Sequence, residues 1–354
     1  MLNQIICGDA LETLKKFPEN CIRCCITSPP YFNLRNYDAK GQIGLEPTIE
    51  DYIAKLVAVF AEVRRVLTDD GTLWVNIADC YSGSIKGSAY YPQYNNGSKE
   101  EGRKGLAGLK DVPKPKWQLP RKNLLGLPWR LAFALQEDGW ILRQDIIWSK
   151  TNCMPESVTD RCTKSHEYIF LLAKEPVYFY NHAAIMEPVA QSTYVRMQQN
   201  IAEQRGSSRT HGGQKNMKAV GGSLGAFGNP QSRRRSGNIE RKERPVPGIK
   251  KGGLAGNIPY EDISGYRNKR SVWSMSTSKI HGVNHYATFP EELAENCILA
   301  GSEIGDTVLD VFNGSGTTCK MAKKHGRNYL GIDINADYCR LAEKRVDSCE
   351  KGLF

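Results

Sequence analysis

The strongest constraint on the fold lies near the C-terminus, where a strand, a glycine-rich turn, a helix and a second strand follow one another. Residues 307–311 predict the first strand, and the turn after it contains Gly314 and Gly316. Residues 329–332 predict the second strand, and Asp333 follows it, 19 positions after Gly314. Glycines let the backbone approach a ligand, a helix N-terminus attracts anions, and an acid about 20 residues on binds ribose hydroxyls. The spacing therefore predicts an α/β nucleotide-binding unit.

A second constraint is the segment Thr27-Ser28-Pro29-Pro30-Tyr31, which follows the apolar residues 24–26. The apolar run predicts a parallel strand buried on both faces. Two consecutive prolines then remove two backbone donors and force a rigid, extended exit from the sheet. The loop presents a hydroxyl, unpaired carbonyls and a ring face, the groups that would hold a planar base taken out of a duplex. The alternative is a proline-rich turn in which Tyr31 packs sideways.

The remaining pattern alternates strands with helices and fits the same α/β class. Asp9 follows the first strand and is either a residue of the sheet's carboxyl edge or only a helix N-cap. The segment 165–180 predicts two short strands that form a hairpin at the sheet edge. Expected strands are 4–7, 72–77 and 141–148, and expected helices are 10–17, 52–67, 127–136, 291–300, 317–325 and one from about 336.

Composition favours a soluble, cytoplasmic protein without a metal. The chain of 354 residues has no apolar run near the ~18 residues that span a bilayer, and nothing near its N-terminus is typical of a signal peptide. Its 11 cysteines, at irregular spacing, fit reduced thiols better than a disulfide framework. Cys24 and Cys25 lie within the apolar strand, and no second pair stands at zinc-finger spacing.

Positive charge is concentrated in residues 186–275, which carry 16 Lys and Arg against 6 Asp and Glu. The whole chain has a net charge of +10, so the remainder is close to neutral. The segment includes Arg233, Arg234, Arg235, Lys250 and Lys251. A basic block on a neutral body favours a polyanionic partner and a nucleic-acid-binding insertion, with a solvated linker as the alternative. The polar stretch 82–122 is interpreted as a lid or a DNA-contacting loop.

These motifs together resemble the S-adenosylmethionine-dependent DNA amino-methyltransferases, in the permuted order with the catalytic motif first and the cofactor motif last. The resemblance implies a Rossmann-like methyltransferase fold with a seven-stranded, mostly parallel sheet, in which the strand ending at Val311 neighbours the strand ending at Thr27. It implies a catalytic half over residues 1–185, a target-recognition insertion over 186–275, and a cofactor-binding half over 276–354. It does not extend into the insertion.

The resemblance also implies roles for individual residues. Ser28, Pro29, Pro30 and Tyr31 would hold the flipped base. S-adenosylmethionine would be bound by Gly314 and Gly316 at its methionine part, by Asp333 at the ribose and by Asp9 at the adenine amino group. Further cofactor-site residues implied in this way are Thr27, Phe289, Asp310, Phe312, Asn313, Ser315 and Thr317.

The expected reaction is methylation of an exocyclic amine in double-stranded DNA. Ser28 precedes the Pro-Pro-Tyr sequence, where this family commonly has serine in cytosine-N4 enzymes and aspartate in adenine-N6 enzymes, so N4-cytosine is preferred and N6-adenine stays open. Methylation of cytosine C5 is disfavoured, because enzymes of that type place a cysteine after proline and this chain has no Pro-Cys pair. A catalytically silent DNA-binding protein and an enzyme acting on RNA or a protein glutamine are the alternatives. A cognate restriction endonuclease is a possible partner.

Overall fold

A computed structural model describes residues 2–33, 39, 41–82, 119–190, 266–277 and 289–349. The chain divides into two compact units, one of residues Met1–Ile185 with Arg270–Phe354, and one of Met186–Lys269. The first unit contains the main sheet. In the second unit, the described residues form the antiparallel pair β6 (Glu187–Pro188) and β7 (Tyr266–Arg267).

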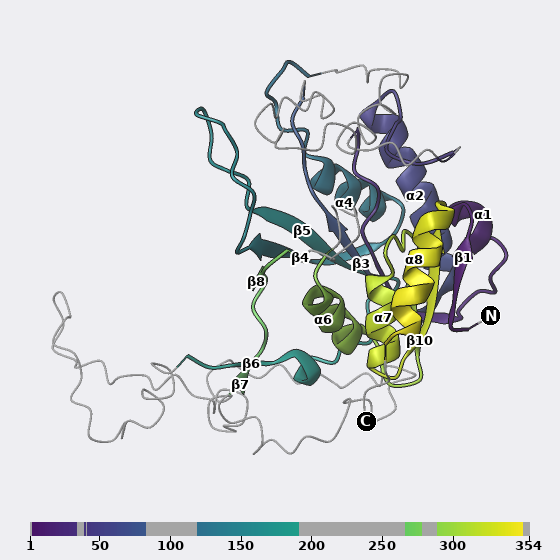
Figure 1. The fold of residues 1–354 in the computed structure, drawn as a ribbon. Coiled ribbons are helices and arrows are strands. Elements are labelled where there is room, and N and C mark those ends of the chain that lie inside the picture. The colour runs from purple at the N-terminus through teal and green to yellow at the C-terminus, as the bar shows by residue number, and fades with distance from the viewer. Residues whose placement is uncertain are drawn as a thin grey trace, which may run out of the picture. The chain divides into compact units, whose positions relative to one another are not determined.

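The main sheet has eight strands in the order β1-β10-β9-β2-β3-β5-β4-β8 (Figure 1). The α/β class is confirmed, and the sheet has one strand more than the seven expected. The strands are β1 (Gln4–Cys7), β2 (Ile22–Thr27), β3 (Leu67–Ile77), β4 (Ile141–Lys150), β5 (His166–Ala173), β8 (Val272–Met275), β9 (Thr307–Asp310) and β10 (Asn328–Asp333).

Strands from the two ends of the chain meet in the middle of the sheet. Strand β2 pairs in parallel with β9, with Cys24 opposite Val308 and Cys25 opposite Leu309. This pairing was expected, and it places the N-terminal loop after β2 beside the C-terminal turn after β9. Strand order reverses at this point, because β3 continues the sheet on one side and β10 and β1 continue it on the other.

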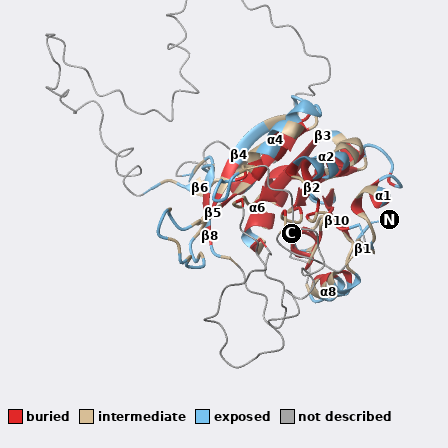
Figure 2. Cartoon of the chain, turned by 90° about the horizontal axis from the view of Figure 1, so that it is seen from above, coloured by how far each residue is buried: buried red, intermediate tan, exposed pale blue. Residues whose placement is uncertain are grey.

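Helices cover both faces of the sheet, and alternate residues of the central strands pack against each side. On one face, α1 (Ala10–Leu14), α2 (Ile49–Val66) and α4 (Leu127–Glu137) pack on Cys25 and Leu73. On the other, α6 (Glu291–Gly301) and α7 (Thr317–Lys324) pack on Cys24 and Trp74. The last helix, α8 (Ala336–Asp347), packs on α7, β1 and β10. Figure 2 shows the buried residues concentrated in the strands and on the inward sides of the helices.

Two expectations about the sheet edge are wrong. Residues 165–180 do not form an edge hairpin: they contribute one strand, β5, which lies between β3 and β4 and is antiparallel to both. Its apolar run Ile169–Ala173 is buried, as suits a strand covered on both faces. The edge strand is β8, within the range expected for the basic insertion, where Trp273 and Met275 are buried against the sheet.

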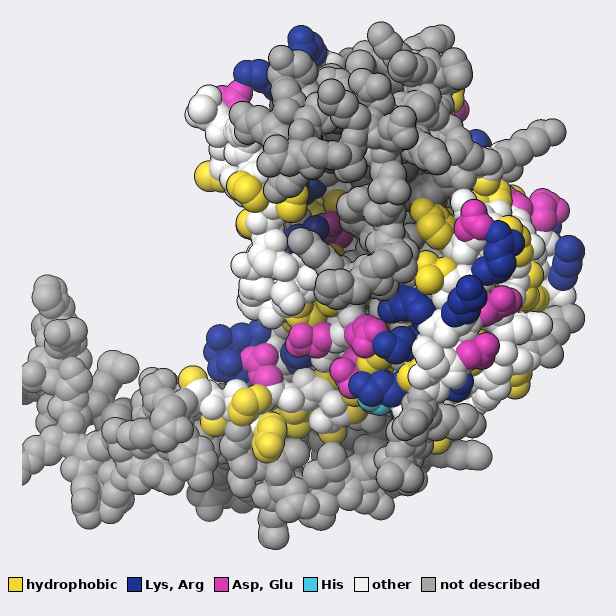
Figure 3. Space-filling view, viewed as in Figure 1, with side chains coloured by type: hydrophobic (Ala, Val, Ile, Leu, Met, Phe, Trp, Pro, Cys, Tyr) yellow, Lys and Arg dark blue, Asp and Glu magenta, His cyan; other side chains and the backbone are white. Residues whose placement is uncertain are grey.

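The surface of the described part carries mixed charges. On the face drawn in Figure 3, Lys and Arg side chains are interspersed with Asp and Glu. Ion pairs account for several of them, such as Lys320 with Glu291 at 2.6 Å and Arg65 with Glu62 at 2.8 Å. No helix among the described residues is long and apolar enough to cross a membrane.

Candidate active site

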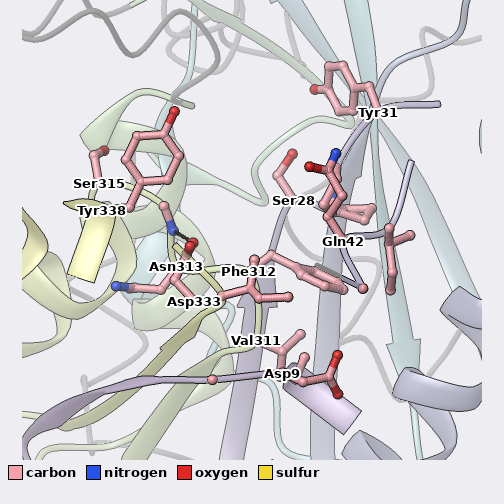
Figure 4. Close-up of a pocket in the computed structure, with 18 of the residues that line it drawn as sticks. Asp9, Ser28, Tyr31, Gln42, Val311, Phe312, Asn313, Ser315, Asp333 and Tyr338 are labelled. Atoms are coloured by element: carbon pink, nitrogen blue, oxygen red, sulfur yellow. Dashed lines mark hydrogen bonds between the residues drawn. The ribbon is translucent and has the colours of Figure 1, made fainter. Parts of the chain in front are cut away.

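A cavity opens at the carboxyl ends of the central strands, where strand order reverses. Open α/β sheets bind ligands at this position. The segments that follow β1, β2, β9 and β10 supply most of its wall, and α8 supplies Tyr338 (Figure 4). The lining residues are Gly8, Asp9, Ala10, Ser28, Pro29, Pro30, Tyr31, Gly41, Gln42, Ile43, Phe289, Val311, Phe312, Asn313, Gly314, Ser315, Thr317, Asp333, Ile334 and Tyr338.

The loop after β2 is held in place from behind. The Tyr52 hydroxyl of α2 donates to the Pro30 carbonyl oxygen at 2.9 Å. Gly44 has φ +106°, and a Cβ there would lie 3.1 Å from the Tyr31 carbonyl oxygen, so only glycine allows this segment to approach so closely. The loop is therefore a rigid wall of the cavity, which suits a surface that must orient a ligand.

Tyr31 is tied to two residues that do not line the cavity. Its hydroxyl donates to Glu167 Oε2 at 2.7 Å, and Lys150 donates to Glu167 Oε1. Burial, and then the charge of Glu167, raise the pKa of Tyr31 well above its ordinary value. The hydroxyl therefore stays protonated and remains a donor at neutral pH.

A buried hydrogen-bond cluster lies beneath the glycine-rich turn. Asp310 is 1% exposed and accepts hydrogen bonds from the hydroxyls of Thr27 at 2.6 Å and Thr318 at 2.7 Å, and from the amide of Phe312 at 3.1 Å. Burial raises the pKa of Asp310 from 3.8 to about 6, although these hydrogen bonds oppose the rise. The cluster joins the end of β2 to the end of β9.

Asp333 organises the turn that faces it. One carboxylate oxygen accepts from the Gly314 amide at 2.7 Å, and the other accepts from the Asn335 amide at 2.8 Å. Burial raises the pKa of this carboxyl group. Asp333 thus connects β9's turn to β10 and still lines the cavity, the position expected of a residue that binds ribose hydroxyls.

Asn313 offers a donor that the described residues do not satisfy. Its side chain fills the space beside Gly331, where a Cβ would lie 2.6 Å from Asn313 Cγ. The Oδ1 atom accepts from Cys319 Sγ at 3.1 Å. The Nδ2 atom is buried and has no partner among the described residues. An unpaired buried donor in a cavity wall is costly unless a ligand or water completes it.

Asp9 combines the two roles that its position suggested. Its Oδ1 accepts from the Glu12 amide at 2.9 Å and so caps α1. The same residue lines the cavity, close to Val311 in Figure 4. Capping therefore does not remove it from the site.

The structure brings most of the expected site residues together, with three exceptions. Thr27, Asp310 and Gly316 do not line the cavity. The first two form the cluster beneath it, and Gly316 faces α8, where a Cβ would lie 2.7 Å from Ala342 Cβ. The expected DNA-binding residues Arg233, Arg234, Arg235, Lys250 and Lys251 lie outside the described residues. Among the described residues, no group of three or more His, Cys, Asp or Glu could hold a metal ion.

Several residues of the site were not anticipated from the sequence. Gln42 and Ile43 come from a loop without periodic pattern, so nothing signalled their position. Tyr338 had a signal, because it lies in the first turns of the helix that follows the acid Asp333. Glu167 and Lys150 belong to strands whose antiparallel pairing was assigned to the wrong place. Val311 and Ile334 complete the wall.

Comparison with known proteins gives a consistent family. The family model described as N6_N4_Mtase, DNA methylase, matches residues 22–344. The Type II methyltransferase M.Cfr9I of Citrobacter freundii is 37% identical over 98% of this chain and 88% of its own length. The Type II methyltransferase M.XycI of Xanthomonas campestris pv. cyanopsidis is 39% identical, with 98% and 88% covered.

Solved structures share the fold. The PvuII DNA methyltransferase (cytosine-N4-specific) superposes with a TM-score of 0.56 at 16% identity, covering 97% of this chain and 86% of that one. The DNA modification methylase TTHA0409 of Thermus thermophilus, solved with S-adenosyl-L-methionine, gives a TM-score of 0.52 at 21% identity, covering 97% and 93%. The extent of the family match and the identity to its curated relatives show that this chain belongs to the N6/N4 family of DNA methylases.

Proposed function

We propose that this chain methylates the exocyclic N4 atom of cytosine in duplex DNA, with S-adenosylmethionine as methyl donor. The observation that carries the proposal is the shared cavity: Ser28 and Tyr31 form one part of its wall, and Asn313 and Asp333 form another. A methyl donor and a base held in these two parts would meet without a covalent enzyme intermediate.

The residues of the C-terminal part fit the donor. Asp333 offers carboxylate oxygens for ribose hydroxyls, and the buried Nδ2 of Asn313 needs an acceptor. Phe289 and Phe312 supply apolar surface for the adenine ring, and Asp9 supplies an acceptor for its amino group. The bound donor would supply an electrophilic methyl group on a sulfonium.

The residues of the N-terminal part fit a flipped base. Tyr31 offers a ring on which the base can stack, a contact worth about 1–3 kcal/mol. The Ser28 hydroxyl and the Pro29 carbonyl can accept the two amine hydrogens. Accepting both would draw the nitrogen toward sp³ geometry and free its lone pair, which the ring otherwise delocalises. Catalysis by this loop is thus positioning and electrostatics.

Ser28 favours cytosine over adenine. A neutral hydroxyl can accept from N4 and also donate to the ring nitrogen N3, whereas an ionised carboxylate only accepts. Adenine N1 could take the same hydrogen bond, so N6-adenine methylation is the competing outcome. The Type II names of the curated relatives also support a role in restriction and modification, with the basic residues 186–275 as the target-recognition insertion and an endonuclease of the same specificity as partner.

The test is to express the chain in a bacterial host without DNA methyltransferases of its own. Plasmid from these cells is digested to nucleosides and analysed by mass spectrometry, and a second sample is sequenced by a method that detects modified bases. N4-methyldeoxycytidine at one sequence motif supports the proposal, whereas N6-methyldeoxyadenosine alone would replace it with the adenine reaction. Unmodified plasmid together with no binding of S-adenosylmethionine in calorimetry would indicate a catalytically silent DNA-binding protein.

A further inference from the structure

A three-residue chain of hydrogen bonds runs from the cavity wall into the sheet. Tyr31 lies on the loop after β2, Glu167 near the start of β5 and Lys150 at the end of β4. The Tyr31 hydroxyl donates to Glu167 Oε2 at 2.7 Å, and Lys150 Nζ donates to Glu167 Oε1. The side chains of Glu167 and Lys150 are 8% and 21% exposed, so the pair is largely withdrawn from water.

The sheet fixes the position of this pair. Strands β4 and β5 are antiparallel, with Trp148 opposite Glu167 and Lys150 hydrogen-bonded to Ser165 through its amide. Lys150 Nζ also lies 4.7 Å from the centre of the Trp148 ring, a cation–π distance. Trp148 is itself buried and donates from Nε1 to the Met275 carbonyl oxygen at 3.1 Å. Lys150 is therefore held from two sides, and Glu167 is held by Lys150.

We propose that the Lys150–Glu167 pair is a positioning device that fixes the ring of Tyr31, and through it the orientation of the target base. This inference rests on the proposed function. Without the bond to Glu167, the ring could rotate about its side-chain torsions. Loss of a single orientation at the reacting centre lowers turnover more than binding.

Glu167 acts through Tyr31 and does not contact the base. Both of its carboxylate oxygens already have partners, one in Lys150 and one in Tyr31. It is not among the residues that line the cavity. Burying a carboxylate is costly unless it is paired, so the ammonium of Lys150 is what permits a charged acceptor at this position.

The central experiment is a double-mutant cycle on the full chain, using tritiated S-adenosylmethionine and unmodified plasmid as substrates. Tyr31→Phe keeps the ring and removes the anchor. Glu167→Gln has one carbonyl oxygen for two donors, so either Tyr31 or Lys150 loses its partner. Each variant is expected to lower kcat about tenfold, which corresponds to about 1.4 kcal/mol, without changing the affinity for S-adenosylmethionine in calorimetry. The double variant should be no slower than either single variant, because both remove the same contact.

A second measurement reports on the base itself. Once sequencing has identified the modified motif, 2-aminopurine is placed at the target position of a synthetic duplex, where its fluorescence rises on unstacking. The wild type should give one restrained fluorescence lifetime in the complex, and Tyr31→Phe and Glu167→Gln should both give a broader distribution. A role in stability alone would leave this distribution unchanged.

The matched control is a second partly buried lysine at the other end of β5. Lys174 pairs with Asp69 at 3.1 Å and with Asn20 at 2.6 Å, and its side chain is 14% exposed. Lys150→Met and Lys174→Met should both lower the melting temperature, but only Lys150→Met should lower kcat. Lys150→Arg should restore most of it, since a guanidinium still pairs with Glu167.

The outcomes separate this inference from the proposed function. An inactive wild type would contradict the proposed function. An active wild type with full kcat in Tyr31→Phe and Glu167→Gln would overturn the positioning role and leave the proposed function intact. Multiplicative losses in the double variant would also overturn it, because they would show that the two residues act independently.

Discussion

The Thr27 hydroxyl donates a hydrogen bond of 2.6 Å to Asp310 Oδ1, joining residues that are 283 positions apart in the sequence. Both side chains are buried, at 0% and 1% exposed. The bond ties the end of β2, which carries the Ser28–Tyr31 loop, to the end of β9, which carries the glycine-rich turn. The two walls of the cavity therefore share one buried support.

The first prediction concerns the pH dependence of this support. Burial raises the pKa of Asp310 from 3.8 to about 6, so the folded state favours the protonated carboxyl. The resulting stabilisation is fully present below pH 3.8 and is lost as pH rises through about 6. Between these values, the free energy of unfolding of the wild type should fall relative to that of Asp310→Asn, by an amount on the order of 3 kcal/mol. Urea unfolding at pH 4, 5, 6 and 7 measures it, and parallel curves for the two proteins would contradict it.

The second prediction separates the base site from the donor site. Ser28→Ala removes the hydroxyl that we expect to accept an amine hydrogen, and the residue lies in the cavity wall opposite the Asp333 half. Turnover should fall by about tenfold to a hundredfold, the loss of a hydrogen bond made in the transition state. The dissociation constant for S-adenosylmethionine should change less than threefold. Weakened donor binding would instead indicate that the loop has a structural role.

The third prediction concerns Gly316, which the sequence suggested as a cofactor contact. Gly316→Ala would place a Cβ 2.7 Å from Ala342 Cβ at a residue with φ +79°. The control is Gly305→Ala, where φ is +88° and nothing lies within 4 Å of the new Cβ. The control carries the backbone strain of about 1 kcal/mol alone, and Gly316→Ala should lose about 1–3 kcal/mol more through the clash with α8. Equal losses of stability in the two variants would show that α8 moves aside at little cost.

The sequence predicted the parts of the site that follow strict local rules. The turn at Gly314, the acid at Asp333 and the prolines after β2 each stand where a parallel strand ends, and the carboxyl ends of parallel strands meet at one edge. The pairing of β2 with β9 came from the resemblance to a permuted family and not from spacing. Local pattern alone cannot join strands that lie so far apart in the chain.

The sequence failed where long-range packing decides the outcome. Residues 169–173 are apolar throughout, which fits a central strand of either direction, and the hairpin signal at Pro176 drew attention to the wrong partner. The role of Glu167 depends on that pairing, so it was invisible until β4, β5 and the Tyr31 loop were placed together. Gly316 showed a correct pattern with a different cause, because the glycine is required by α8 and not by the cavity wall.

The fourth prediction concerns the basic insertion, whose residues Arg233, Arg234 and Arg235 lie outside the described part. If the insertion supplies phosphate contacts, affinity for DNA should fall with salt, with a log–log slope of about −0.9 for each contact. Replacing the three arginines by serine should make the slope shallower by up to about 3 and leave S-adenosylmethionine affinity unchanged. Fluorescence anisotropy with a labelled duplex over a series of KCl concentrations measures the slope, and an unchanged slope would return this run to solvated surface.

The last prediction tests whether Asp333 binds the donor or only shapes the turn. Its carboxylate accepts from the amides of Gly314 and Asn335 at 2.7 and 2.8 Å, so Asp333→Ala removes both contacts together with the acceptor expected for ribose. Donor affinity should fall by about tenfold to a hundredfold, as for the loss of a charged hydrogen bond of roughly 1.5–3 kcal/mol. The control is Asn335→Ala, which keeps the Asp333 carboxylate and its backbone partners and removes the α8 cap formed by the Asn335 side chain. Calorimetry with S-adenosylmethionine should show the large loss for Asp333→Ala only, and equal losses in the two variants would mean that the carboxylate acts by holding the start of α8.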